Sequence, residues 1–321
     1  MLDDRLPRRR LCADGSASSR ESRFAGRGRN LQVYRGVVHH APVATGLYHL
    51  PRAGGVKSSN IRTTTTMNIG ELYDRSVAGT YDRDERGLLS GGRNLAFQQI
   101  EKFVPADDVR NVLDLAVGTG QSLVAMQRFF PRAALHGIDL SAEMLRIAET
   151  KLAFHSIRDD VANTDRHFMR NSMNLLLMHF LTTFVDGEDI VESTAKLLQP
   201  KGHYSIVSTT FEAFPRIYSL ARTLFSEEFI QEKNPAPANT ETIVSFCANA
   251  GLDVVSVERF TKKVSFVDFE DFYDFGMNSG FFTHVLSHLD EAQIAGLASM
   301  GGVFPLEDEY SASVVLARRP W

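Results

Sequence analysis

The sequence predicts an α/β fold in which a mostly parallel sheet is covered by helices on both faces. From position 67 onward, short apolar runs alternate with stretches of helical period, as in chains built from repeated β-α units. One apolar run, residues 112–115, ends in a glycine-rich turn, and the next, residues 135–139, ends in an acid. With 43% hydrophobic residues over 321 positions, the chain can bury a central sheet.

The predicted elements follow one another in a regular order. A helix with an apolar stripe stops at Pro105, and the helix after the glycine turn buries Leu123 and Met126. Ser141 is expected to cap the following helix, and Thr240 a later one that ends at Gly251. Strands are expected at residues 112–115, 135–139, 154–157, 174–177, 203–208, 252–259 and 310–317.

The turn after the first strand has the composition of a ligand-binding loop. Gly118 and Gly120 let backbone amides approach a ligand at the start of a helix, because glycine accepts positive φ and carries no Cβ. Nineteen residues past Gly120, Asp139 ends the second strand, where a carboxylate can hold two ribose hydroxyls. This pairing predicts a cofactor that contains a nucleoside.

Two common classes of nucleotide site do not fit the sequence. A dinucleotide fingerprint needs a third glycine, and that position is Leu123, so NAD and FAD are poor candidates. The chain has no G-x-x-x-x-G-K-[ST] loop either, which excludes the usual nucleoside triphosphate site.

The remaining pattern resembles the class I S-adenosylmethionine-dependent methyltransferases, whose glycine motif runs acid-x-G-x-G-x-G. Asp114, Gly118 and Gly120 match it, and Ala116 stands at the first glycine position. The resemblance implies a Rossmann-like fold with a mostly parallel seven-stranded sheet, helices on both faces and a helical cap over the C-terminal edge. It also implies S-adenosyl-L-methionine as the cofactor, bound at these four positions and at Asp139, with Asp114 orienting the turn.

The resemblance also assigns residues around the adenine ring. Asp160 would meet the adenine amino group, and Asp159 is an equally available choice. Leu140 and Val161 would sandwich the ring.

Two Tyr-Asp pairs precede the first core helix, Tyr73-Asp74 and Tyr81-Asp82. They resemble the element with which ubiquinone, menaquinone and biotin-pathway methyltransferases begin, which covers the cofactor as a lid. Tyr81 is taken as the matching tyrosine.

The fourth predicted strand ends in Met178 and His179, at the edge where open α/β sheets place their ligands. Met178 is expected beside the cofactor. His179 could accept a proton from the methyl acceptor, or it could be a packed, hydrogen-bonded core residue. His284 and His288 lie four apart on a predicted helix, but no neighbouring carboxylate supports a metal site, so a solvated face is expected.

Two aromatic segments interrupt the predicted domain, near residues 211–239 and 261–309. Phenylalanine at this density suits either an apolar acceptor pocket roofed by helices or an extension of the core. We expect these segments to cap the domain and to determine which substrate it accepts.

Residues 1–66 differ in character from the rest of the chain. They carry twelve Lys or Arg against four acids and show no sustained apolar period, so we expect a disordered basic extension before a domain at 67–321. The extension could be an organelle transit peptide, which would make the protein mitochondrial, a nucleic-acid-binding arm, or sequence upstream of a true start at Met67.

The remaining residues carry the balance of the net charge of −4, so the predicted domain is acidic. An acidic surface argues against a nucleic-acid substrate. No apolar run is long enough to span a bilayer. Cys12 and Cys247 are isolated, which indicates no disulfide framework and favours a reducing, cytoplasmic location.

The sequence therefore predicts a methyltransferase that moves a methyl group to an apolar or aromatic small molecule by in-line displacement. A cofactor-binding regulatory or partner subunit without turnover is the alternative, and an oxidoreductase is a third reading that the missing glycine opposes. The oligomeric state is left open.

Overall fold

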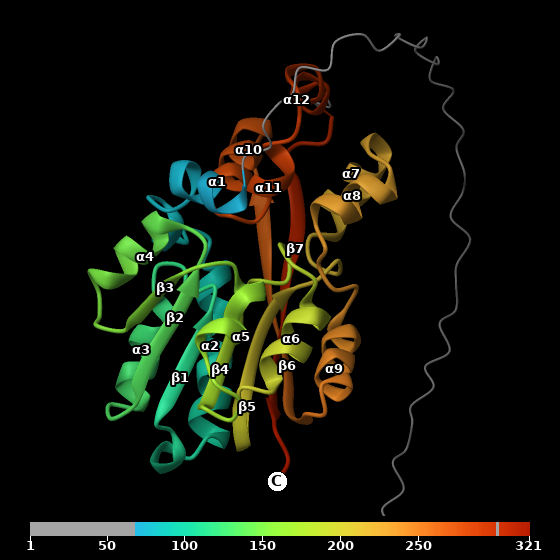
Figure 1. Ribbon diagram of the computed structural model, residues 1–321. Coiled ribbons are helices and arrows are strands. Elements are labelled where there is room, and N and C mark those ends of the chain that lie inside the picture. The colour runs from blue at the N-terminus through green and yellow to red at the C-terminus, as the bar shows by residue number, and fades with distance from the viewer. Residues whose placement is uncertain (1–67, 300–301) are drawn as a thin grey trace, which may run out of the picture. The chain divides into compact units, whose positions relative to one another are not determined.

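One seven-stranded sheet in the order β3-β2-β1-β4-β5-β7-β6 forms the centre of the molecule (Figure 1). Strands β1 to β5 pair in parallel, and β7 runs antiparallel between β5 and β6. The strands are β1 (Asn111–Leu115), β2 (Ala134–Asp139), β3 (His155–Arg158), β4 (Met173–His179), β5 (Leu198–Thr209), β6 (Asp253–Phe266) and β7 (Leu306–Arg318). The predicted sheet is confirmed, and its strand order reverses between β1 and β4, the place where such sheets bind ligands.

The structure, a computed structural model, describes residues 68–299 and 302–321. The expectations for residues 1–66, including a start at Met67, lie outside the described residues. None of the helices in the described ranges is long and apolar enough to cross a membrane.

Helices cover both faces of the sheet (Figure 1). Strand β4 shows why, because its residues are buried on both sides: Leu175 and Leu177 pack with one helix layer, while Leu176 and Met178 pack with the other. The first layer is α2 (Leu88–Phe103), α3 (Gln121–Phe129) and α4 (Ala142–Glu149), and the second is α5 (Thr164–His167), α6 (Gly187–Ala195) and α9 (Thr240–Asn249).

Helix boundaries follow the local sequence closely. Helix α2 ends before Pro105, and Ser141 caps α4 by accepting a hydrogen bond of 3.1 Å from the Met144 amide, as predicted. The cap of α9 was predicted one residue too late. Asn239, not Thr240, accepts from the Thr242 amide, and the Thr240 hydroxyl instead meets Ser313 on β7.

The remaining helices gather at the carboxyl ends of the parallel strands, where α1 lies beside α10 and α11 (Figure 1). They are α1 (Ile69–Ser76), α7 (Pro215–Leu224), α8 (Glu227–Lys233), α10 (Phe269–Asn278), α11 (Thr283–Leu286) and α12 (Glu291–Ala298). Three short 3-10 turns complete the described elements: η1 (Tyr81–Arg83), η2 (Ala106–Asp108), which leads into the amino end of β1, and η3 (Val161–Asn163).

The second cap segment is shorter than its predicted bounds of 261–309. Strands β6 and β7 stay paired as far as Phe266 and Leu306, well past the expected strand ends. Val264 and Phe266 are buried at alternate positions of β6, whereas Lys262 and Lys263 just before them are exposed. These two adjacent lysines interrupt the apolar pattern by which a strand is predicted from the sequence.

Candidate cofactor site

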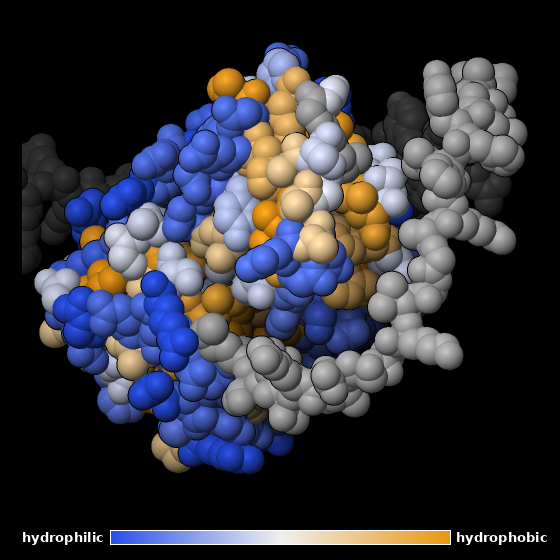
Figure 2. Space-filling view, turned by 90° about the horizontal axis from the view of Figure 1, so that it is seen from above, coloured by the Kyte–Doolittle hydropathy of each residue, from blue (hydrophilic) through white to orange (hydrophobic). Residues whose placement is uncertain are grey.

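A cavity opens at the carboxyl ends of β1, β2 and β4, beneath α1 and the cap. It contains about 980 Å³ of space between atoms, including its mouth, and apolar residues gather at the centre of the face above it (Figure 2). Eight of the eleven predicted site residues line it: Tyr81, Ala116, Gly118, Asp139, Leu140, Asp160, Val161 and His179. The position, at the carboxyl ends of the parallel strands, is that of a small-molecule site.

The turn after β1 is built from left-handed backbone. Ala116, Gly118 and Gly120 have φ of 62°, 53° and 81°. Space is open above Gly118, where a Cβ would meet only Tyr81, at 3.8 Å. Gly120 does not line the cavity, and a Cβ there would come within 3.0 Å of Ala148 on α4, so this glycine permits helix packing instead.

Asp139 ends β2 at the floor of the cavity. Its carboxylate accepts hydrogen bonds from the Gly118 amide at 2.8 Å and the Ser141 amide at 2.9 Å, so it also fixes the glycine turn. Each carboxylate oxygen keeps a second lone pair for a ligand hydroxyl. Burial raises the pKa of Asp139 to about 6, against the opposing effect of these two amides.

The structure distinguishes the two acids after β3. The Asp159 carboxylate is occupied by the Asp160 amide, the Asn163 side chain and His167 Nε2, the last at 2.7 Å. Asp160 accepts only the Ala162 amide through Oδ1, at 2.9 Å, among the contacts of the described residues. Asp160 therefore keeps more acceptor capacity for an adenine amino group than Asp159 does, whereas the sequence left the two acids as equal choices.

His179 is buried, and both of its ring nitrogens have partners. Nδ1 lies 3.1 Å from the Ser122 hydroxyl and Nε2 lies 3.0 Å from the Ser205 hydroxyl. Burial, aided by the positive charge of Arg93, lowers the pKa of His179 to about 3. The imidazole is neutral, and a role in proton transfer would require it to release one of these serines.

Two predicted residues lie behind the cavity wall. Met178 is fully buried in β4 and packs beneath Tyr204, whose hydroxyl approaches its sulfur at 3.8 Å. Asp114 is buried on the α2 side of β1, where loss of solvent raises its pKa well above normal. Buried Arg93 of α2, which the sequence analysis missed, opposes that rise.

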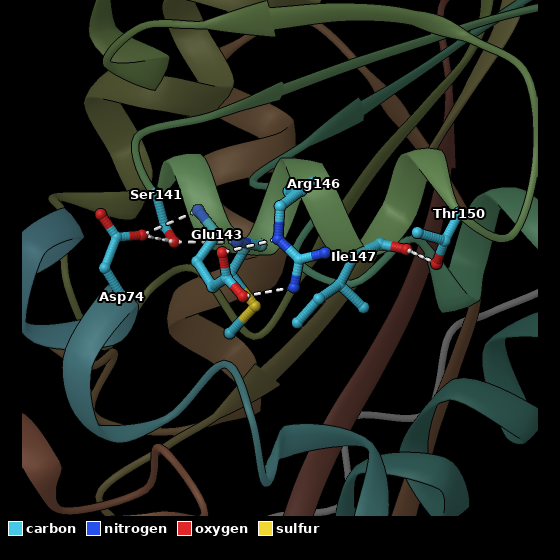
Figure 3. Close-up of polar contacts among 7 residues, drawn as sticks. Asp74, Ser141, Glu143, Arg146, Ile147 and Thr150 are labelled. Atoms are coloured by element: carbon cyan, nitrogen blue, oxygen red, sulfur yellow. Dashed lines mark hydrogen bonds and ion pairs between the residues drawn. The ribbon is translucent and has the colours of Figure 1, made fainter.

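A short N-terminal segment closes one side of the cavity. Asp74 of α1 accepts hydrogen bonds from the Ser141 hydroxyl at 2.5 Å and the Glu143 amide at 2.9 Å, at the start of α4 (Figure 3). Asp82 accepts from the Thr119 hydroxyl at 2.6 Å, beside the glycine turn, and pairs with Lys151. Both acids of the predicted lid therefore attach it to the edge of the site.

The same segment contacts the cap. Tyr73 donates to the Gly280 carbonyl at 3.2 Å, and Thr80 donates to the Asn278 carbonyl at 2.8 Å. Tyr73 and Tyr81 line the cavity, and burial raises the pKa of Tyr81 to about 12, so it remains protonated. Gly70 lets α1 press directly on Leu140, since a Cβ there would lie 2.9 Å from its Cγ.

His284 was predicted on a solvated face, and that prediction is wrong. The side chain is buried on α11 and packs edge-on against Phe184, with ring centroids 4.9 Å apart. Neither ring nitrogen has a hydrogen-bond partner among the described residues. The spacing of His284 and His288 could not predict this burial, because Phe184, which covers His284, comes from the distant loop after β4.

Residues 112–202 match a protein-family model described as a methyltransferase domain. The ubiquinone/menaquinone biosynthesis C-methyltransferase of Desulfotalea psychrophila is 28% identical over 163 residues, which is 49% of this chain and 64% of that protein. The demethylmenaquinone methyltransferase of Porphyromonas gingivalis is 40% identical over 88 residues, 26% of this chain and 34% of that protein. The chain thus matches less than two thirds of either relative's length.

Solved structures show the same fold. A Bacillus halodurans protein described as a candidate methyltransferase has a TM-score of 0.52 at 13% identity, covering 70% of this chain and 99% of its own. The YcgJ protein of Bacillus subtilis gives 0.50 at 13% identity, covering 71% and 99%.

The chain therefore carries a class I S-adenosylmethionine-dependent methyltransferase domain. Within that class, its sequence is similar to the C-methyltransferases of quinone biosynthesis. S-adenosylmethionine is the cofactor of this class, in agreement with the prediction from the glycine turn and Asp139.

Proposed function

We propose that this protein transfers a methyl group from S-adenosylmethionine to an apolar or aromatic small molecule. The observation that carries the proposal is the joint placement of Gly118 and Asp139 in one cavity whose remaining wall is mostly apolar. Gly118 would underlie the methionine portion, and Asp139 would hold the ribose. Leu140, Val161 and Asp160 would surround the adenine ring.

When bound, the cofactor supplies an electrophilic methyl group on a positively charged sulfur, which an acceptor atom displaces in line. The protein's task is then to align the two reactants and to exclude water. Alignment alone can be worth about 7–11 kcal/mol. Tyr73, Tyr81 and Phe281 are the side chains that would close over the reacting centre, since they join the lid and cap on one side of the cavity.

An acceptor that is already nucleophilic fits this cavity best. The tyrosines are protonated, His179 is engaged with two serines, and Asp159 is engaged with His167. An electron-rich ring carbon or a phenolate needs little help from a base. The similarity to quinone C-methyltransferases supports the same class of acceptor.

Calorimetric titration with S-adenosylmethionine and its demethylated product tests the cofactor assignment. We expect both to bind the wild type and neither to bind Gly118→Val or Asp139→Ala, while circular dichroism shows both variants folded. Undiminished affinity in both variants would refute the site.

Incubating cell extract with methyl-labelled cofactor, followed by mass spectrometry, tests turnover. A labelled small molecule is expected with the wild type and is expected to form more slowly with His179→Ala if that histidine takes part in the reaction. Cofactor binding without any labelled product would instead favour a regulatory subunit. Removal of residues 1–66 is expected to leave the labelling unchanged.

A further inference from the structure

Two histidines face each other at the edge of the sheet, outside the cofactor site. His136 of β2 and His155 of β3 are register partners on neighbouring parallel strands, and their Nδ1 atoms lie 3.4 Å apart. Strand β3 forms the edge of the sheet beside β2 (Figure 1). Neither side chain lines the cofactor cavity, so the proposed methyl transfer does not use them. We call them the histidine pair.

The distance within the histidine pair suits a shared metal ion better than a hydrogen bond. In a hydrogen bond, one Nδ1 would carry the proton and donate it to the other, and bonds from nitrogen are ordinarily about 2.7–3.2 Å long. The observed distance of 3.4 Å is longer. A tetrahedral zinc ion with Zn–N distances of about 2.0–2.1 Å holds two ligand nitrogens about 3.3–3.4 Å apart. The two nitrogens therefore already have the separation that one zinc ion requires.

The packing around the pair holds both rings in place. Phe168, just after α5, lies edge-on against both imidazoles, with ring centroids 5.4 Å from His136 and 6.4 Å from His155. The two imidazoles are nearly perpendicular to each other, at 86°. Among the hydrogen bonds of residues 68–299 and 302–321, each imidazole has only the other as a partner. Binding of an ion would therefore break no other hydrogen bond, and ligands held in advance lose less entropy when they bind.

The chemistry of the pair selects the metal. Neutral imidazole is a ligand for zinc, copper and nickel, whereas magnesium and calcium require oxygen ligands. Copper(II) prefers a square-planar arrangement, in which neighbouring ligands lie closer together than in a tetrahedron. The described residues contain no group of three or more His, Cys, Asp or Glu side chains that could hold a metal, so an ion on the pair keeps its other positions for water.

We propose that His136 and His155 bind one Zn²⁺ ion through their Nδ1 atoms and that the ion joins the edge strand β3 to β2. Each ring then carries its proton on Nε2, so that both Nδ1 lone pairs face the metal. Strand β3 has four residues and pairs with β2 alone among the described strands, and it leads directly into Asp159 and Asp160. The ion would therefore stabilise the strand that ends at the cofactor site. This inference requires neither cofactor binding nor methyl transfer.

Calorimetric titration of the metal-stripped full chain with zinc chloride tests the site, at about pH 7.5, where imidazole is mostly neutral. His136→Gln and His155→Gln, which each remove one ligand, are both expected to raise the zinc Kd at least about tenfold. His288→Gln, which removes an exposed histidine of the cap, is the matched control and is expected to bind as the wild type does. Residues 1–67 contain further histidines, but all four proteins share them, so the comparison removes their contribution.

Thermal unfolding tests whether the ion stabilises the fold. At a free Zn²⁺ concentration about a hundredfold above the Kd, the wild-type Tm is expected to rise by about 5–10 °C. The rise is expected to be at least halved in His136→Gln and His155→Gln and to be complete in His288→Gln. Magnesium at the same concentration is expected to leave every Tm unchanged.

Nitrogen-15 NMR of the histidine rings identifies the ligand atoms in the wild type, without any substitution. Zinc is expected to shift the Nδ1 resonances of His136 and His155 together and to leave the ring protons on Nε2. Equal zinc affinity in the wild type and both pair variants, a loss in only one of them, or shifts at other histidines alone would overturn the inference. Failure to bind S-adenosylmethionine, with zinc binding retained, would contradict the proposed function alone.

Discussion

Asp74 and Ser141 are 67 positions apart in the sequence, and their side chains are joined by a hydrogen bond of 2.5 Å. Ser141 also caps α4, so one hydroxyl accepts from the helix and donates to the carboxylate of the lid (Figure 3). Asp74 completes the arrangement by accepting the Glu143 amide in the first turn of α4. The position of α1 over the cavity is therefore coupled to the helix that follows Asp139.

Replacing Asp74 with alanine is expected to release α1 from the edge of the site. The change removes two hydrogen bonds to a carboxylate, so we expect the free energy of unfolding to fall by about 1–3 kcal/mol and the cofactor Kd to rise. Glu71→Ala, on the exposed face of the same helix, is the control. Limited proteolysis and calorimetry measure both effects, and equal behaviour of the two variants would contradict the coupling.

Cofactor binding is expected to weaken as the pH falls through about 6. Burial holds the pKa of Asp139 near that value, and the ionised carboxylate accepts ribose hydroxyls better than the protonated acid does. The Kd for S-adenosylmethionine should therefore decrease between pH 5 and pH 7. Asp139→Asn, which cannot ionise, should bind weakly at every pH. A wild-type affinity that is flat over this range would show that the carboxylate does not hold the ribose.

Replacing Ala116 with glycine is expected to stabilise the protein. Ala116 has a φ of 62°, and a non-glycine residue in this region costs about 1–2 kcal/mol, which exceeds the entropic penalty of about 0.5–1 kcal/mol for glycine. We expect a gain of about 0.5–1 kcal/mol in the free energy of unfolding by urea denaturation. Ala125→Gly, the same change within helix α3, should instead destabilise by a similar amount. If both substitutions lower the free energy of unfolding, the backbone at Ala116 is not strained.

The residues that the sequence assigns to the cofactor mostly line one cavity, and they could be found from the sequence because the contacts that place them are local. The turn with Gly118 joins β1 to α3 directly, and Asp139 follows from the end of the next apolar run. The tether of Asp74 and the serine partners of His179 were not predicted, since each brings together residues from distant elements. Gly120 belongs to the glycine motif that the sequence analysis uses. Its function in helix packing could not be predicted, because it depends on the position of α4 in the fold.

Replacing His284 with leucine is expected to stabilise the protein, and more so in acid. Its ring nitrogens are buried without partners among the described residues, so an apolar side chain of similar size removes a desolvation penalty of about 1–3 kcal/mol.

Burial, with a smaller contribution from His288, lowers the pKa of His284 from 6.5 to about 4. The unfolded chain therefore binds a proton below pH 6.5 that the folded protein refuses until about pH 4, and wild-type stability falls across that interval. His284→Leu has no such group to titrate. The difference in the free energy of unfolding between the variant and the wild type should therefore grow by about 2 kcal/mol between pH 8 and pH 5. His288→Leu, at an exposed position one turn further on, should show little of either effect, and urea denaturation at the two pH values measures both. A His284→Leu protein that is less stable than the wild type at pH 8 would mean that the imidazole has a partner in solution, which would contradict its isolation in the cap.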